Sequence, residues 1–288
     1  MERNTDRKEI LSVLRRFTSS SLMRMMVAVM AVGLLASCSE DDDTQEGQLK
    51  WYEDTAMLES DFLQALYEAQ SPTPEKESHS LWPITDDNPD LEWKDVVRKG
   101  DGSTAHMVLV CAMLNHNDMK YWLPNDTFRI SKWNGLWVTI PQEWDRNKRA
   151  YEGMDSVASR MRMIQMLGLR PDCRYDTMVE FYIDVDGLFR PAHDPDITTT
   201  SVAAGFANGM YDNYVVGETN FQEWFNYNLS VAYTGNGACP WTQLGYTYDW
   251  HHGADREGLS EYVASFNTLA YIKSRESCWT FIRKMMWR

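Results

Sequence analysis

The residues best suited to chemistry gather in one segment, YDWHHGADREGLSE, residues 248–261. It combines histidines with carboxylates, a mixture that serves metal binding or general acid–base catalysis. Asp249 and His251 are two residues apart, so both side chains would share one face of a strand. The candidate catalytic residues are Asp249, His251, Glu257 and Glu261, with Arg190 upstream. Because no HExxH motif is present, we favour the alternative, a hairpin loop whose charges are solvated.

A second acidic group lies in DVDGLFRPAHDPD, residues 184–196. Oxygen ligands close to a turn glycine suit Ca²⁺. An EF-hand loop would also need an acid and a terminal glutamate where Leu188 and Pro195 stand. We therefore expect no cofactor, with calcium as the alternative. The calcium ligands would be Asp184, Asp186, Asp194 and Asp196.

The 12 tryptophans form a third group. Several lie in polar or proline-rich segments, where no periodicity requires burial: Trp51, Trp82, Trp93 and Trp122. Exposed aromatic rings offer flat amphipathic surfaces to sugars or to protein partners. The alternative is that they fill the core. We expect an aromatic-rich binding face that includes these four side chains.

The N-terminus predicts export to a membrane surface. Residues 25–35 carry no charge and follow Arg24, which is typical of a signal peptide and too short to span a bilayer. The next residues, LASC (35–38), resemble the lipobox of bacterial lipoproteins. That resemblance implies cleavage before Cys38 and attachment of fatty acyl chains to it. The acidic cluster at 40–43 resembles the surface-export tag of certain Gram-negative outer-membrane lipoproteins, although a solvated tether is the alternative.

Charge and cysteine content narrow the class of protein further. Without residues 1–37 the chain has 22 basic and 39 acidic residues, a net charge of −17, which excludes a nucleic-acid-binding protein. With 43% hydrophobic residues the chain predicts a folded protein. No Cys-x-x-Cys pair indicates a zinc or redox site. The other cysteines, Cys111, Cys173, Cys239 and Cys278, allow three disulfide pairings or free thiols.

The periodicity of the chain mixes helices and strands without a βαβ rhythm. Helices are expected at 54–69, about 155–167 and 219–229, and strands at 104–114, 177–187, 244–250 and 259–266. Asn134-Gly135 between apolar runs predicts a β-hairpin over 128–140. Residues 277–287 fit either type. The sequence thus predicts an α+β fold with an antiparallel sheet and a few packed amphipathic helices. We expect a signal peptide (1–37), an acidic tether (38–50) and one globular domain (51–288).

Two further resemblances concern the globular part. RMIQMLGLRPD (162–172), DGLFRPAHDPDI (186–197) and PWTQLGYTYDW…GLSEY (240–262) resemble a string shared by uncharacterised bacterial proteins, which implies a common fold and no particular chemistry. Arg190 and Glu261 resemble the arginine and glutamate of ADP-ribosyltransferases. The Ser-Thr-Ser element of that family is not evident between them, although TTTS occurs at 198–201.

These features lead to three functional hypotheses. The first is an outer-membrane lipoprotein, exposed at the cell surface, that binds a glycan, peptide or protein through an aromatic-rich face. The second is a secreted hydrolase or transferase that uses acids and histidines of 249–261. The third is an accessory subunit of an envelope complex.

Lipidation gives the first testable prediction. Because the thiol of Cys38 is the expected site of acylation, Cys38→Ala should abolish labelling by a fatty-acid probe and leave the precursor uncleaved. Radiolabelled palmitate and an immunoblot of precursor and mature forms would measure both effects. Unchanged labelling of the variant would contradict the assignment.

Overall fold

The computed structural model describes residues 49–98, 102–119, 125–207 and 211–287. Cys38, the acidic cluster at 40–43 and Trp122 lie outside these ranges. Leu49–Arg288 folds as a single unit of helices and antiparallel sheets, so the predicted α+β class is confirmed. Within the described ranges, every helix is too short or too polar to cross a lipid bilayer.

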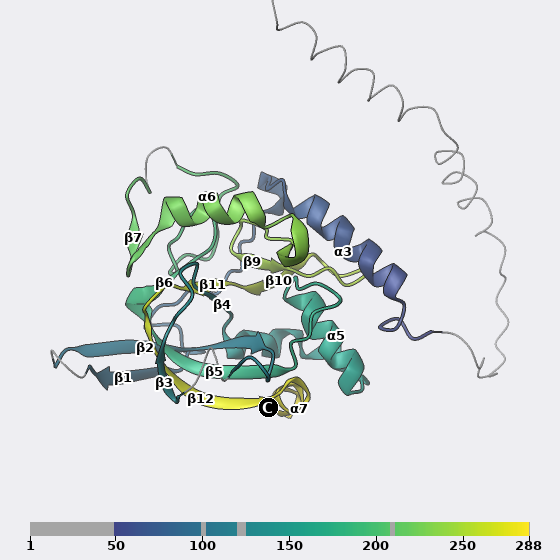
Figure 1. The fold of residues 1–288 in the computed structure, drawn as a ribbon, viewed down its shortest axis with the longest axis horizontal. Coiled ribbons are helices and arrows are strands. Elements are labelled where there is room, and N and C mark those ends of the chain that lie inside the picture. The colour runs from purple at the N-terminus through teal and green to yellow at the C-terminus, as the bar shows by residue number, and fades with distance from the viewer. Residues whose placement is uncertain (1–48, 99–101, 120–124, 208–210, 288) are drawn as a thin grey trace, which may run out of the picture. The chain divides into compact units, whose positions relative to one another are not determined.

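A five-stranded antiparallel sheet forms the floor of the molecule (Figure 1). Its strand order is β1 (Trp93–Val97), β2 (Thr104–Leu114), β5 (Thr177–Asp184), β12 (Leu269–Ser277) and β3 (Thr127–Arg129). The long strands β2 and β5 are buried along almost their whole length. Apolar and polar residues alternate along β5, but the polar positions do not form a solvent-exposed face. Glu180, for example, is buried and accepts a hydrogen bond from Ser274 Oγ at 2.8 Å.

Shorter strands build smaller sheets beside this floor. The strand β11 (Tyr262–Ala264) pairs with both β4 (Leu136–Val138) and β6 (Leu188–Phe189). The strand β9 (Tyr246–Tyr248) pairs with β10 (Glu257–Ser260), and β7 (Val215–Val216) pairs with β8 (Thr219–Asn220). A bridge between Cys111 and Thr139 links β2 to the end of β4.

The hairpin predicted around Asn134-Gly135 is wrong in its pairing. The turn itself is present, since Gly135 has φ of 80° and its N–H donates to Lys132 O. However, β3 on one side of the turn pairs with β12, whereas β4 on the other side pairs with β11. A Cβ at residue 135 would lie 2.4 Å from the Val263 side chain, so close packing against β11 also requires glycine here.

The α-helices begin at side chains that cap their free amides. They are α3 (Thr55–Ala69), α5 (Ser156–Met166), α6 (Phe221–Val231) and α7 (Cys278–Met286). Asp54, Asp155, Asn220 and Ser277 each accept a hydrogen bond from a first-turn amide. The short 3₁₀ helices are η1 (Pro74–Lys76), η2 (Pro141–Tyr151), η3 (Val185–Gly187) and η4 (Gly235–Gly237). The ambiguous segment 277–287 is thus mainly helical.

The predicted strand at 259–266 is two strands, and the break between them matters for function. The pairing of β10 with β9 shifts between Glu257 and Ser260, and β11 begins with Tyr262 in a different sheet. Glu261 lies at the junction, where its N–H donates to Gly245 O at 3.0 Å. Its backbone is therefore fixed between the two small sheets.

A buried ion pair joins the β9–β10 hairpin to α5. Arg162 Nη1 and Nη2 donate to Asp249 Oδ1 and Oδ2 at 2.9 and 2.6 Å. Both side chains are almost completely buried. The expectation that the charges of residues 249–261 are solvated is therefore wrong for Asp249, because it has a distant arginine as its partner. Glu261 is also buried.

This pair gives a stability prediction. Asp249→Ala would leave the Arg162 guanidinium buried without a counter-charge, so we expect a loss of about 3–5 kcal/mol in the free energy of unfolding. Urea unfolding followed by circular dichroism would measure it. Asp255→Ala is the matched control, because Asp255 is exposed on the same hairpin and surface substitutions change stability by at most about 0.5 kcal/mol. Equal stability of both variants would contradict the prediction.

Candidate functional site

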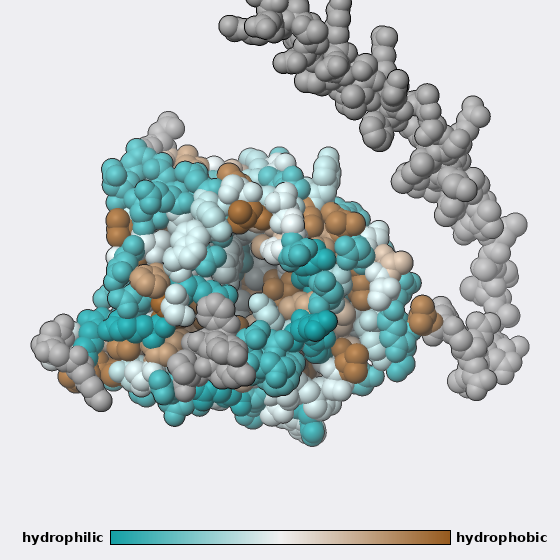
Figure 2. Space-filling view, viewed as in Figure 1, coloured by the Kyte–Doolittle hydropathy of each residue, from teal (hydrophilic) through white to brown (hydrophobic). Residues whose placement is uncertain are grey.

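Two adjoining cavities form a cleft between the five-stranded sheet and β4. The deeper cavity has a volume of about 270 Å³ and the outer one about 160 Å³. They share Leu114, Lys132, Leu136 and Tyr175 in their walls. Figure 2 shows this face of the molecule hollowed near its centre, with apolar side chains in the wall of the hollow. We call the two cavities together the cleft.

Aromatic rings line the deeper cavity. Trp137 on β4 and Trp241, which follows α6, meet edge to face with ring centroids 6.1 Å apart. Trp241 is buried and its Nε1 donates to Pro191 O at 2.7 Å, so its ring is fixed. Tyr248 on β9 adds a third ring. A rigid aromatic wall can receive a flat ligand at little cost in conformational entropy.

Glu261 lines the same cavity as a buried carboxyl group. It is 5% exposed, and its Oε1 has no hydrogen-bond partner among the described residues. Burial raises the pKa of Glu261 well above its usual range, and the nearby Arg190 guanidinium opposes the rise without cancelling it. Burial therefore favours the neutral, protonated form of the Glu261 carboxyl group.

Arg190 lies behind the cavity wall and is not presented to a ligand. It is completely buried, and its planar guanidinium lies 5.0 Å from the centre of the Tyr262 ring. Its Nε and Nη2 donate to the backbone carbonyls of Trp82, Asp196, Ile197 and Thr199. The resemblance of Arg190 and Glu261 to an ADP-ribosyltransferase pair is thus not matched by an accessible arginine.

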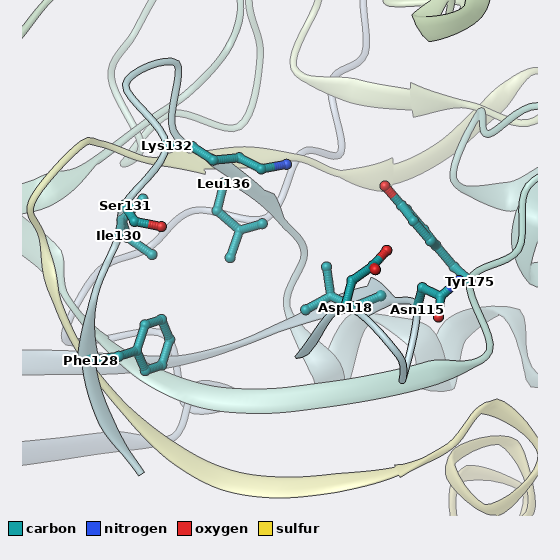
Figure 3. Close-up of a pocket in the computed structure, with 9 residues that line it drawn as sticks. Asn115, Asp118, Phe128, Ile130, Ser131, Lys132, Leu136 and Tyr175 are labelled. Atoms are coloured by element: carbon teal, nitrogen blue, oxygen red, sulfur yellow. The ribbon is translucent and has the colours of Figure 1, made fainter. Parts of the chain in front are cut away.

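Polar groups surround the outer cavity (Figure 3). The Lys132 ammonium and the Tyr175 hydroxyl point across it toward each other, with Asp118 and Asn115 below them. Burial lowers the pKa of Lys132 and raises that of Tyr175. The outer cavity thus offers hydrogen-bonding groups beside the aromatic wall of the deeper one.

The other predicted catalytic residues lie elsewhere. The His251 ring packs edge to face against Trp51 at 5.2 Å, and burial lowers its pKa. Glu257 accepts hydrogen bonds from Ser78 Oγ and Ser80 Oγ at 2.6 and 2.9 Å. With Asp249 paired to Arg162, Glu261 is the one predicted catalytic side chain that lines the cleft in the described structure.

The three predicted binding tryptophans that the structure describes have different surroundings. Trp51 contacts His251, and Trp93 stacks on His106 with centroids 4.3 Å apart. Trp82 is buried beneath the Arg146 guanidinium, 4.5 Å from its ring, so its expected exposure is wrong. The cleft tryptophans, Trp137 and Trp241, were missed because Trp137 lies in an apolar run that indicates core and Trp241, between Pro240 and Thr242, has no periodic pattern around it. Their neighbourhood in space is set by the pairing of β4 with β11, which periodicity does not reveal.

The predicted calcium ligands lie in two separate local arrangements. Asp184 is paired with Arg98, and Asp186 lies 3.8 Å from the same guanidinium. Asp194 Oδ1 accepts from Asp196 N, and Asp196 Oδ1 accepts from Thr198 N. In the part of the chain that the structure describes, no three His, Cys, Asp or Glu side chains come together as a possible metal site.

The four described cysteines are free thiols. Cys111 and Cys239 line the deeper cavity, and burial raises the pKa of each thiol to about 12. Neither is therefore an activated nucleophile.

Comparisons with protein-family models, with curated proteins and with solved structures found no match to this chain. The case for function consequently rests on the geometry of the cleft.

Glu143 is a second buried acid, next to the strand break. Its carboxyl oxygens accept from Ser260 N at 3.0 and 3.1 Å and from Ser260 Oγ at 2.8 Å. Burial nevertheless raises its pKa from 4.5 to about 7. The folded protein thus holds a proton that the unfolded chain releases, so stability is fully present below about pH 4.5 and falls as the pH rises through 7.

We therefore predict a pH dependence of stability that Glu143→Gln reduces. Ionisation of Glu143 should cost roughly 3 kcal/mol between pH 5 and 8, from its displaced pKa. Urea unfolding at several pH values would show a smaller decline in Glu143→Gln than in the native protein. Glu152→Gln, at an exposed position after η2, is the matched control. Identical pH slopes for Glu143→Gln and the native protein would contradict this assignment.

Proposed function

We propose that this protein binds a glycan or peptide by taking one ring-sized group of the ligand into the cleft. The observation that supports the proposal is the combination, in one cavity, of a fixed aromatic wall and a buried carboxyl oxygen without a partner. Buried polar atoms normally find hydrogen-bond partners, and a ligand that supplies the partner would explain an unpartnered oxygen in the wall of a cavity.

The size of the cleft favours a small group over a folded partner. Pockets for whole drug-sized ligands measure about 300–1,000 Å³, so a cavity of about 270 Å³ suits a single sugar ring or a single side chain. A stable protein–protein interface needs roughly 800 Å² on each partner. A glycan chain or an extended peptide fits this cavity better than a protein surface does.

The location proposed from the sequence agrees with this role. A lipid anchor at Cys38 and display at the outer-membrane surface would give the cleft access to extracellular glycans or peptides. The acidic net charge of the chain would then disfavour anionic polymers as ligands through long-range repulsion.

A hydrolase is the second candidate, and Glu261 is the observation that favours it. A buried acid with a raised pKa suits general-acid catalysis. However, the histidine and aspartate that would have assisted it, His251 and Asp249, contact Trp51 and Arg162 instead. Release of new reducing ends or new amines from a bound ligand would distinguish turnover from binding.

Blocking the cavity tests the proposed function. Gly237 is exposed and lines the deeper cavity, and a Cβ there would meet nothing within 4 Å, so Gly237→Phe should place a large ring at the exposed edge of the cavity without strain. On glycan and peptide arrays we expect the native protein to retain ligands and Gly237→Phe to lose them, with at least about tenfold weaker binding.

Gly205→Phe is the matched control, because a Cβ at Gly205 also meets open space and Gly205 lies outside the cleft. It should bind as the native protein does. Thermal melting would check that both variants fold. Ligand binding that survives in Gly237→Phe, or no binding to either array, would overturn the proposed function.

A further inference from the structure

Glu261 is aimed into the cleft by the break between β10 and β11. Its neighbours face the opposite way: Ser260 Oγ donates to Glu143, and the Tyr262 hydroxyl donates to the carbonyl of Trp82. Because side chains alternate along an extended backbone, Glu261 points to the other side, into the deeper cavity. Among the described residues that line that cavity, it is the one carboxylic acid.

An unpartnered oxygen at this depth indicates what a ligand must supply. Leaving a buried polar atom without a hydrogen bond costs about 1–3 kcal/mol. A ligand group that hydrogen-bonds to the Glu261 carboxyl group in the cavity wall would offset that loss. The ligand therefore carries a hydrogen-bonding group on a ring that fits between aromatic walls.

The charges around Glu261 indicate that this group is uncharged. Arg190 lies behind the carboxyl group and Lys132 lines the same cavity, so an ammonium group on the ligand would meet two cations. The other titratable groups that face Glu261 or share its cavity are weak acids whose pKa burial raises: Cys111, Tyr175, Tyr233, Cys239, Tyr246 and Tyr248. Glu143 is hydrogen-bonded to Ser260, the residue before Glu261, and therefore lies on the opposite side of the strand from the Glu261 side chain.

We propose that the cleft binds an uncharged sugar ring, which packs against Trp137 and Trp241 while a hydroxyl or N-acetyl group hydrogen-bonds to the carboxyl group of Glu261. The neutral acid both donates and accepts a hydrogen bond, as sugar hydroxyl and amide groups also do. The inference rests on the proposed binding function and selects glycans, without charged groups, from the two ligand classes proposed above.

The first experiment compares two sugars that differ in one charge per ring. The probes are the trimer of N-acetylglucosamine, which is neutral, and the trimer of glucosamine, which is cationic, within a panel of uncharged oligomers of glucose, mannose, galactose and xylose. Calorimetric titration of the full chain at pH 5.5 to 8.5 would give the affinities. We expect an uncharged oligomer to bind and its affinity to fall about tenfold per pH unit above the pKa of Glu261, because only the protonated form binds.

The second experiment uses the amide as a permanent mimic of the neutral acid. Glu261→Gln keeps one donor and one acceptor, so we expect affinity within about threefold of the native protein at pH 5.5 and no pH dependence from this site. Glu261→Ala should weaken binding by at least about tenfold. Glu143→Gln should retain the pH dependence, which separates Glu261 from its neighbour. Melting temperatures verify folding of each variant.

The outcomes separate this inference from the function on which it rests. Binding of the glucosamine trimer that strengthens with pH, or loss of binding in Glu261→Gln, would mean an ionised Glu261 and would overturn the inference. A pH dependence that persists in Glu261→Gln would assign it to another group, such as Lys132, and also overturn it. Binding of peptides without any uncharged sugar would overturn the inference and leave the proposed function standing.

Discussion

The completely buried guanidinium of Arg190 joins two segments of this interior through its hydrogen bonds. Its Nε and Nη2 donate to the carbonyl of Trp82 and to carbonyls within residues 196–199, whereas Nη1 has no partner among the described residues. Its flat face covers the Tyr262 ring at the start of β11. The same crowding requires glycine at 245, where φ is 85° and a Cβ would lie 2.6 Å from Arg190 Cδ. Loops distant in sequence are thereby fixed around the central strand of a small sheet.

That one cation also sets the charge balance of the interior. Arg190 lowers the pKa of both Glu143 and Glu261, yet burial prevails over this attraction in each case. Glu143 has hydrogen bonds from Ser260 in addition, whereas Glu261 Oε1 has none from the described residues. Two acids of the same type thus have different surroundings: Glu143 is hydrogen-bonded at the strand break, whereas Glu261 lines the deeper cavity with one carboxyl oxygen that has no partner among the described residues.

The sequence predicted the elements better than their partners. Helices near 54–69 and 155–167 and the strand at 104–114 follow from periodicity, which is a local property, whereas the strand predicted at 177–187 ends at Asp184 and residues 185–187 form η3. The pairing of β3 with β12 joins residues 140 to 144 positions apart, and no local pattern encodes it. In the candidate site, Glu261 was predicted from its residue type. Its burial was not predicted, because it depends on the break between β10 and β11, and the sequence predicted one continuous strand there. Asp249 was misjudged as solvated because its partner, Arg162, lies 87 residues away. Trp137 has apolar neighbours as core residues do, and Trp241 stands between Pro240 and Thr242, so only the tertiary structure identifies both as parts of a cavity wall.

The position of β12 inside the five-stranded sheet has a consequence for how the chain folds during synthesis. This strand is followed only by α7, yet it lies between β5 and β3 rather than at an edge. Until residues 269–277 are present, β5 has an open edge and β3 has no partner in the sheet. A chain that emerges from its N-terminus cannot complete this sheet before residues 269–277 have been made, because non-local strand pairing must wait for both strands. The topology therefore ties completion of the five-stranded sheet, and with it cooperative folding of this domain, to the synthesis of β12.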